Sequence, residues 1–287
     1  MAKLFGFVQF DFAGKLPLAD GRYLAGGEET VLVVERTDAA LAPSRRRRRG
    51  RTAPPTTEPG PVALTRVTVI RASAPHESRA EAAGWLDGAC EAEETVQRLA
   101  SEAIAPLNRA LHAHAVAAAD PRGRELAPEE AERVLIGYGS GEETAGGRFT
   151  DARQVDLAAR SSSRRRRHEE ELRPQERAAA VLRGRERLDA CETLLLRARA
   201  DLDAGREREA ALQLRVGLEA LLVELDGAME DPGHEKDMAD LRGRAAEVAA
   251  AAEAAVGGEL EEGQRDRVAR VLEVAERILR RRRVHRG

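Results

Sequence analysis

Apolar residues follow two different spacings along this 287-residue chain, and the change between them predicts two modules. In the first half, short β-rich segments alternate with turn residues, a pattern typical of strands. In the second half, apolar residues recur every three or four positions, which places them on one face of a helix. The chain is long enough for two domains that each bury a core.

The first half is predicted to form an α+β domain over residues 1–156, a mostly antiparallel sheet with packed helices. The expected strands are residues 4–12, 22–25, 30–36, 64–72, 133–138 and 148–155. The expected helices are residues 78–89 and 91–118, and Pro106 should kink or break the second. The first strand has apolar side chains on both faces, which predicts a central strand or one with a bulge near Gln9.

Two polar stretches are expected to lack regular structure. Residues 41–63 combine an arginine run with prolines and threonines, and this composition cannot bury enough apolar surface to offset the loss of chain entropy. We therefore expect a disordered insertion inside the first domain. Residues 157–172 are rich in Ser, Arg and Glu and are expected to form a flexible linker between the two domains.

From residue 173 to residue 283 the pattern predicts only helices, as a four-helix bundle or a pair of helical hairpins with coiled coil-like spacing. The apolar stripes span residues 181–202, 211–225, 238–255 and 268–278. Breaks are expected at 203–205, 231–233 and 257–258, where a residue can adopt the left-handed conformation that ends a helix. Short connections make neighbouring helices antiparallel, so an up-down bundle is the simplest arrangement.

Net charge and cysteine content exclude several classes of protein. The net charge is −3, from 47 basic and 50 acidic residues, and this favours neither nucleic acid nor an anionic membrane. Cys90 and Cys191 lie in different modules without a CxxC partner, which fits a reducing cytoplasm. No apolar run approaches the roughly 20 residues of a membrane span, and no signal peptide is evident. We expect a soluble, cytoplasmic protein.

Three arginine runs, at residues 45–49, 164–167 and 280–283, are candidates for binding nucleic acid. Clustered arginines release counterions from a polyphosphate and bind it without sequence preference. All three runs lie in predicted linkers or at the C-terminus, however, and the second half has no aromatic residue on which a base could stack. Solvated segments are the favoured interpretation, and weak nucleic-acid contact is the alternative.

Two places could hold an enzyme active site, and each has a simpler interpretation. The loop from Gly137 to Gly147 follows a strand, but it lacks both an expected helix and the GK[ST] of a phosphate-binding loop, so a hairpin turn is favoured. His114 lies on the apolar stripe of its helix and is expected to be a hydrogen-bonded core histidine; His112 is turned about 200° away, so the two cannot share a metal. No motif predicts a metal or cofactor.

Residues 194–224, LLLRARADLDAGREREAALQLRVGLEALLVE, resemble one helical hairpin of a tetratricopeptide or of a HEPN-type domain. The similarity lies in Gly205 at the turn, small Gly217 and large Leu221. The arginine-to-histidine spacing of HEPN nucleases is matched by Arg280 and His285, inside an arginine run. The resemblance implies helical-hairpin geometry and carries no functional residue across.

The function favoured by the sequence is structural or protein-interacting, with a protein partner or self-association through the C-terminal helices. Leu218, Leu221, Leu222 and Leu225 make the second helix of the bundle wider in apolar surface than a single packing seam needs. Excess apolar width implies a second contact, so these four residues are the predicted protein-binding site. An enzyme with a site near His114 or the loop from Gly137 to Gly147 remains a further alternative.

Overall fold

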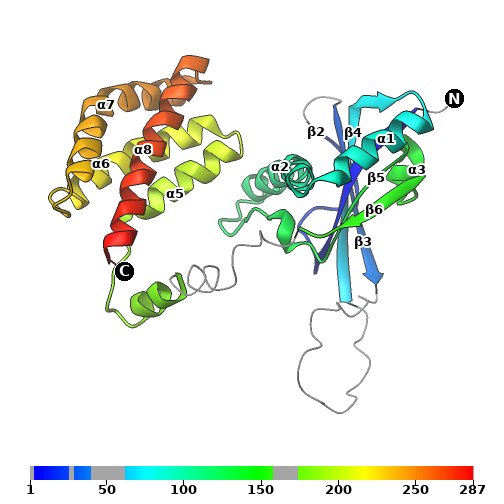
Figure 1. Cartoon of the computed structure of the whole chain (residues 1–287), viewed down its shortest axis with the longest axis horizontal. Helices are drawn as coiled ribbons and strands as arrows, with labels where there is room; N and C mark the ends of the chain where they lie inside the picture. The colour runs from blue at the N-terminus through cyan, green and yellow to red at the C-terminus, as the bar shows by residue number, and fades with distance from the viewer. Residues whose placement is uncertain (1–2, 26–28, 40–61, 158–173, 287) are drawn as a thin grey trace, which may run out of the picture. The chain divides into compact units, whose positions relative to one another are not determined.

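The computed structural model describes residues 3–25, 29–39, 62–157 and 174–286 (Figure 1). The chain divides into two compact units, an N-terminal unit of residues 1–160 and a helical unit of residues 161–287. Within the described ranges, every strand belongs to the N-terminal unit. The predicted fold class, an α+β domain followed by an all-α part, is confirmed.

An antiparallel sheet of six strands, in the order β2-β3-β4-β1-β5-β6, forms the N-terminal unit. The strands are Leu4–Ala13 (β1), Gly21–Ala25 (β2), Thr30–Ala39 (β3), Val62–His76 (β4), Arg133–Ser140 (β5) and Asp151–Val155 (β6). The chain's first strand is central, because β1 pairs with both β4 and β5, as its two apolar faces require. Its irregularity falls between Phe5 and Phe7, not near Gln9.

The edges of the two predicted polar stretches belong to the folded unit. Val62 and Ala63 lie in β4, so the strand begins inside the segment expected to be disordered; residues 41–61 of that segment lie outside the described residues. Leu157, placed in the predicted linker, packs in the core of the N-terminal unit. The rest of that linker also lies outside the described residues.

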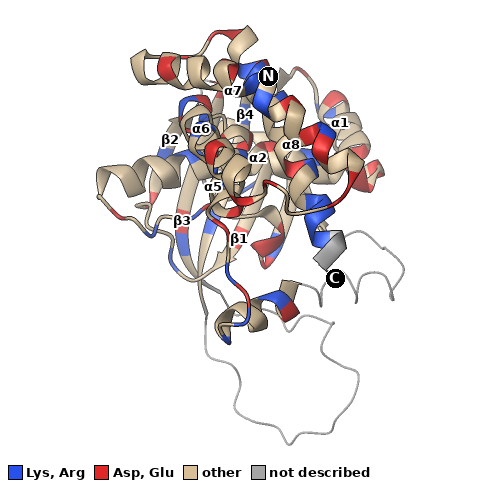
Figure 2. Ribbon diagram, turned by 90° about the vertical axis from the view of Figure 1, so that its left-hand side faces the viewer, with Lys and Arg blue, Asp and Glu red and all other residues tan. Residues whose placement is uncertain are grey.

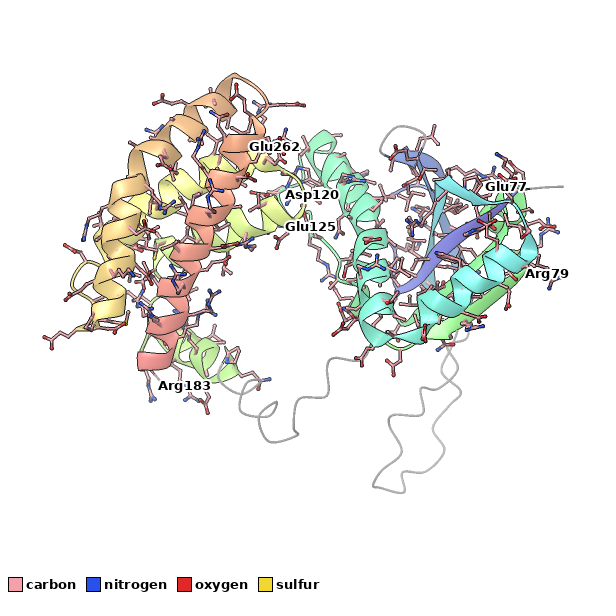
Figure 3. All side chains as sticks on the ribbon, turned by 45° about the horizontal axis from the view of Figure 1, so that its top comes forward. Glu77, Arg79, Asp120, Glu125, Arg183 and Glu262 are labelled. Carbon is pink, nitrogen blue, oxygen red and sulfur yellow. The ribbon has the colours of Figure 1, made fainter. Side chains whose placement is uncertain are left out.

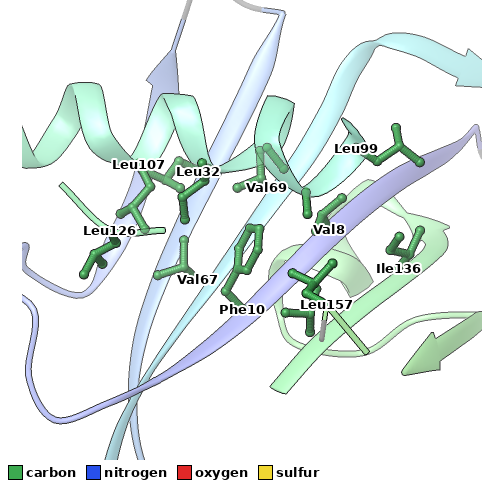
Figure 4. Packing of buried hydrophobic residues seen from close by; sticks show 14 of the residues in the cluster. Val8, Phe10, Leu32, Val67, Val69, Leu99, Leu107, Leu126, Ile136 and Leu157 are labelled. Carbon is green, nitrogen blue, oxygen red and sulfur yellow. The ribbon is translucent and has the colours of Figure 1, made fainter. Parts of the chain in front are cut away.

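Two helices, α1 (Arg79–Glu91) and α2 (Glu93–Ala117), cover one face of the sheet (Figures 1 and 4). Strand and helix side chains meet there in one apolar core that includes Val8, Phe10, Leu32, Val67, Val69, Leu99, Leu107 and Ile136. Pro106 lies inside α2, which continues through it. The expected break is absent because the residues around Pro106 are held against the sheet by burial, with Leu107 fully buried.

The opposite face of the sheet carries a smaller apolar cluster and a polar one. Phe7, Val33 and Ile70 pack with Ala145 of the short helix α3 (Gly141–Ala145). Beside them, the buried carboxylate of Asp11 accepts hydrogen bonds from Arg66 at 2.9 Å and from Arg133 at 2.6 Å. Each oxygen of the Asp11 carboxylate thus has an arginine donor, as a buried carboxylate requires.

Four long helices form the helical unit: α5 (Ala190–Asp203), α6 (Glu207–Glu224), α7 (Pro232–Gly257) and α8 (Glu262–Arg286). Their leucines, alanines and valines make one core that is separate from the core of the sheet. Figures 1 and 3 show α5 with α6 as one antiparallel hairpin and α7 with α8 as another, with α8 lying across the first. A pair of packed hairpins, one of the two predicted arrangements, therefore describes this unit.

The first predicted stripe of this unit proves to be two segments. Residues 174–182 form a separate short helix, and α5 begins only at Ala190. Gly184, with φ of +69°, adopts a left-handed conformation between them, just after Arg183 (Figure 3). Leu188, which shares the helical spacing of the stripe, is 58% exposed. Spacing alone could not show that the chain turns between Val181 and Leu188.

The predicted breaks between the long helices fall where expected but use different residues. Gly205 has φ of +72° after α5, as predicted for a left-handed stop. Between α6 and α7 the left-handed residue is Gly227, whereas Asp231 caps the start of α7 by accepting from the backbone N–H of His234 at 3.0 Å. Gly258, after α7, is extended.

Replacing Gly137 with alanine should destabilise the N-terminal unit by about 1–3 kcal/mol, the usual result of overpacking. A Cβ at Gly137 would lie 2.5 Å from the Asp151 carbonyl oxygen and 2.8 Å from Cζ of Phe7. Urea unfolding measured by Trp85 fluorescence tests this. In the control, Gly88→Ala on α1 meets nothing within 4 Å and should stabilise by about 0.5–1 kcal/mol. Equal stability of Gly137→Ala and the parent chain would contradict the packing argument.

Candidate functional site

The loop from Gly137 to Gly147 is filled by the protein itself. The expected hairpin is present, since β5 and β6 pair antiparallel, but α3 lies in the connection and β6 begins at Asp151 instead of residue 148. A Cβ at Gly139 would lie 2.6 Å from Oγ1 of Thr144, and Ser140 donates to Glu143 at 2.6 Å. These glycines allow close packing of the chain, so the loop offers no cradle for a phosphate.

His114 lies at the solvent-exposed end of α2, not in the core where it was predicted. The buried stripe of α2 ends at Leu111, and the residues of α2 after it are exposed or half-buried. Both His112 and His114 are exposed. Within the described part of the chain, no group of three or more His, Cys, Asp and Glu side chains could hold a metal ion.

The four leucines predicted to bind a partner are placed mainly inside the helical unit. Leu218, Leu221 and Leu225 are buried in its core, with 2%, 0% and 0% exposure, and Leu222 is half-buried against the same core. The reason is that α6 packs against α5, α7 and α8 together, so that its wide leucine face is used by three neighbours. These leucines hold the bundle together instead of forming a free surface.

The excess apolar width of α6 is real, but it lies on the opposite face. Leu212, Val216 and Val223 are 39%, 51% and 79% exposed, and at about 100° per residue they align along the side of α6 that points away from the core. Glu219 occupies the third position of this line, between Val216 and Val223. We call these residues, 212, 216, 219 and 223, the outer stripe of α6. Their spacing was visible in the sequence, but which side of α6 faces solvent was not.

A dense set of charges gathers where α5 and α7 begin and α6 and α8 end, a region we call the ionic end. Its members are Arg177, Asp189, Glu192, Glu224, Asp231, Asp237, Arg277, Arg281 and Arg282. Acidic residues occupy the starts of α5 and α7 and arginines the end of α8, which is the distribution that helix dipoles favour, whereas Glu224 lies at the end of α6. Long sequence separations between the partners hid this cluster from sequence analysis.

Glu224, from the end of α6, caps the start of α5. Its carboxylate accepts hydrogen bonds from the backbone N–H groups of Ala190 at 3.1 Å and Cys191 at 3.0 Å. The residue at the usual capping position, Asp189, makes no such hydrogen bond and pairs instead with Arg282 of α8. Two carboxylates thus join the start of α5 to the ends of two other helices.

Arg282 is the most enclosed charge of the ionic end, at 6% exposure. It pairs with Asp189, and its charge also lowers the pKa values of Glu192 and Glu224. Burial alone would raise the pKa of Glu192, but the hydrogen bond of 2.6 Å from Arg177 and the neighbouring arginine charges outweigh burial and lower it. These carboxylates are therefore ionised at neutral pH, as a buried arginine requires.

Arginine–aspartate pairs also join the start of α7 to the end of α8. Arg277 donates two hydrogen bonds to Asp237, each of 3.1 Å, and Arg281 lies 3.0 Å from the same carboxylate. Arg281 also lies over Gly233, where a Cβ would come within 2.6 Å of its Nη1 atom. Nearby, buried His234 places Nε2 at 3.2 Å from the carbonyl oxygen of Leu225. The glycine thus makes room for the arginine at the first turn of α7.

The described part of the third arginine run is therefore built into the fold, which corrects its interpretation as a solvated tail. Figure 2 shows the basic residues at the C-terminal end of α8. Of these, Arg281 and Arg282 are held by aspartates of α7 and α5, while Arg280 and Arg283 are exposed. The other two arginine runs lie outside the described residues.

The ionic end holds charge and does not present a nucleophile. Burial, and then the hydrogen bond with Glu224, raises the pKa of the Cys191 thiol to about 12, so the thiol is protonated at neutral pH. Arg177 keeps Glu192 ionised, and hydrogen bonds from Cys191 and Ala190, with a smaller contribution from Arg282, keep Glu224 ionised. This cluster stabilises the helix ends, and the outer stripe of α6 is the better candidate for contact with another molecule.

Comparisons with known proteins identify no relative. No protein-family model matches the chain, and no curated protein or solved structure matches it. In the described ranges, no helix combines the length and apolar character needed to cross a membrane. The arguments about function therefore rest on the residues themselves.

Removal of the Glu224 carboxylate should destabilise the helical unit, because the first N–H groups of α5 would lose their acceptor. For Glu224→Ala we expect a loss of about 0.5–2 kcal/mol, the usual cost of losing a helix cap. Urea unfolding followed by far-UV circular dichroism measures it. Glu253→Ala, at an exposed position of α7, is the control and should change stability little. Equal effects of the two substitutions would show that Glu224 does not act as a cap.

Stability of the helical unit should fall with acid. The pKa values of Glu192 and Glu224 are lowered from their ordinary value of 4.5, so their contribution is complete above that value and is lost as pH falls through the lowered folded pKa. Urea midpoints measured from about pH 7 downward should decline once the pH falls below about 4.5. Glu224→Gln should flatten this decline. An unchanged slope in that variant would contradict the assignment.

Proposed function

We propose that this protein acts in protein–protein assembly and that the outer stripe of α6 is its contact surface. The observation that carries the proposal is that α6 has apolar side chains on both faces. One face supplies the core of the helical unit, and the other presents Leu212, Val216 and Val223 to solvent. Apolar side chains that gather on the exposed face of a helix are typical of a surface that another molecule covers.

The distribution of exposed apolar residues supports this choice of surface. Ten large hydrophobic side chains are exposed in the described part of the chain, and three of them lie on α6. No other described helix carries more than one. Single exposed hydrophobics are common on protein surfaces, whereas three in line along one helix are typical of a binding face.

The energy available from this face suits a modest interaction. Complete burial of a valine or leucine side chain contributes about 1.5–3 kcal/mol, and part of that is already gained where the side chain is half-covered. Val223, the most exposed of the three, therefore has the most to gain from a partner. Leu212 and Val216, which lie four residues apart on the same stripe, would extend the contact along the helix.

The other two functions considered from the sequence have less support. In the run at residues 280–283, two arginines are occupied by aspartates, which reduces the charge free to bind a polyphosphate. His114 is exposed, and Gly137 and Gly139 of β5 are packed against neighbouring chain. We therefore propose a non-enzymatic, protein-interacting role.

Val223→Asp should reduce capture of partner proteins by the full-length chain at least about tenfold, because a carboxylate would lose its hydration on contact. Quantitative mass spectrometry of proteins captured from native extract measures the effect. Leu196→Asp, at a 64% exposed position on α5 away from the outer stripe, is the matched control and should leave capture unchanged. Unchanged capture by Val223→Asp, with normal helicity, would exclude the outer stripe as the contact surface.

A further inference from the structure

The start of α5 lies beside two carboxylates that can cap it, and one of them is held by another partner. Glu224 of α6 accepts from the backbone N–H groups of Ala190 and Cys191. Asp189 occupies the N-cap position itself, and its backbone has the extended conformation of a capping residue, with φ of −77° and ψ of 147°. Its side chain nevertheless makes no capping hydrogen bond. Asp189 is therefore a cap that is in position but not in use.

Arg282 of α8 keeps Asp189 from capping, because it holds the Asp189 carboxylate in an ion pair. The side chain of Arg282 is only 7% exposed, so it depends on this counter-charge. Removing one partner of a buried ion pair costs more free energy than losing a helix cap. While the end of α8 is docked, Asp189 therefore stays with Arg282, and the start of α5 relies on Glu224.

The contacts of α8 change from apolar to charged after Leu279, which is buried in the core of the helical unit. The next four residues, 280–283, are all arginines. Two of them, Arg281 and Arg282, pair with aspartates of other helices, and the other two are exposed. The Nη1 atom of Arg282 is buried and has no hydrogen-bond partner among the described residues, which lowers the gain from docking. Separation of this segment would expose charged groups and leave the apolar core closed.

We propose that the end of α8, residues 280–286, is a detachable segment, and that Asp189 is a reserve cap of α5 that makes its release easier. When the segment is docked, Asp189 pairs with Arg282. When the segment leaves, water solvates the guanidinium, and the freed Asp189 carboxylate turns to the first N–H groups of α5. Both partners of the broken pair are thus satisfied again. The outer stripe of α6 takes no part in this change, so the inference is independent of the proposed function.

Hydrogen exchange of the full-length chain, measured by mass spectrometry of its peptides, tests whether Asp189 takes over the cap. Glu224→Ala should speed exchange at the start of α5 about fivefold, because Asp189 is occupied by Arg282. Addition of Arg282→Ala frees Asp189 and should bring this exchange back to within about twofold of the wild type. Further addition of Asp189→Ala should abolish the rescue. Arg283→Ala removes the exposed neighbouring arginine and is the control, which should give no rescue.

The same measurement tests whether the end of α8 is detachable. Arg282→Ala alone should speed exchange in residues 280–286 and leave residues 268–279 protected, because the apolar contacts of α8 lie in the second range. Equal acceleration in both ranges would overturn the detachable segment.

Two results would overturn the reserve cap. If Arg282→Ala gives Glu224→Ala no protection at the start of α5, Asp189 does not move to that helix. If the protection remains after Asp189→Ala, another group supplies the cap. A purely structural role of Arg282 predicts that the double variant is less protected than Glu224→Ala alone, which is the opposite of the expected rescue.

Discussion

A helix leaves its first backbone N–H groups without partners, and the helical unit meets this requirement for α5 with a carboxylate from another helix. Glu224 accepts from the first turn of α5, and this releases Asp189 to hold the enclosed guanidinium of Arg282. The two interactions depend on each other. If Asp189 capped its own helix, the buried Arg282 would lose the carboxylate that it pairs with, and losing one partner of a buried pair costs about 3–5 kcal/mol.

This exchange also explains how the remaining charges are placed. Arg177 reaches Glu192 from the short helix of residues 174–182, and Arg277 and Arg281 share Asp237. Each arginine therefore ties one helix terminus to another. Packing of the apolar core fixes how the helices lie side by side, while these bonds fix how far each helix slides along its neighbour. Together they give the four helices a single register.

Much of the architecture could be predicted because it follows from short-range periodicity. Alternating apolar residues located all six strands, and the two apolar faces of β1 indicated its central place. The start of α5 could not be predicted, because Val181 and Leu188 keep the helical spacing across the turn at Gly184. The cap at α5 was also out of reach, since Glu224 lies 34 positions after Ala190. Contacts of that range depend on the tertiary fold.

Which face of α6 is exposed also could not be predicted from the sequence. The sequence indicates that α6 has more apolar width than one neighbour requires, but it assigns that excess to Leu218, Leu221, Leu222 and Leu225. Small residues on α6 are the better guide to its inner face: Ala210, Ala211 and Gly217 are fully or almost fully buried, and Gly217 lies against Leu195. Close approach of two helices needs small side chains, so the leucines beside them had to be core.

Each unit encloses a core of its own, so the stability of this chain has two separate contributions. The residues of the sheet core and those of the helix core form separate clusters. Each core therefore makes its own contribution to the free energy of unfolding, so unfolding has to be followed with a probe in each unit. Sequence drift can also proceed at different rates in the two halves, because a change that loosens one interior leaves the other with its full complement of packing partners.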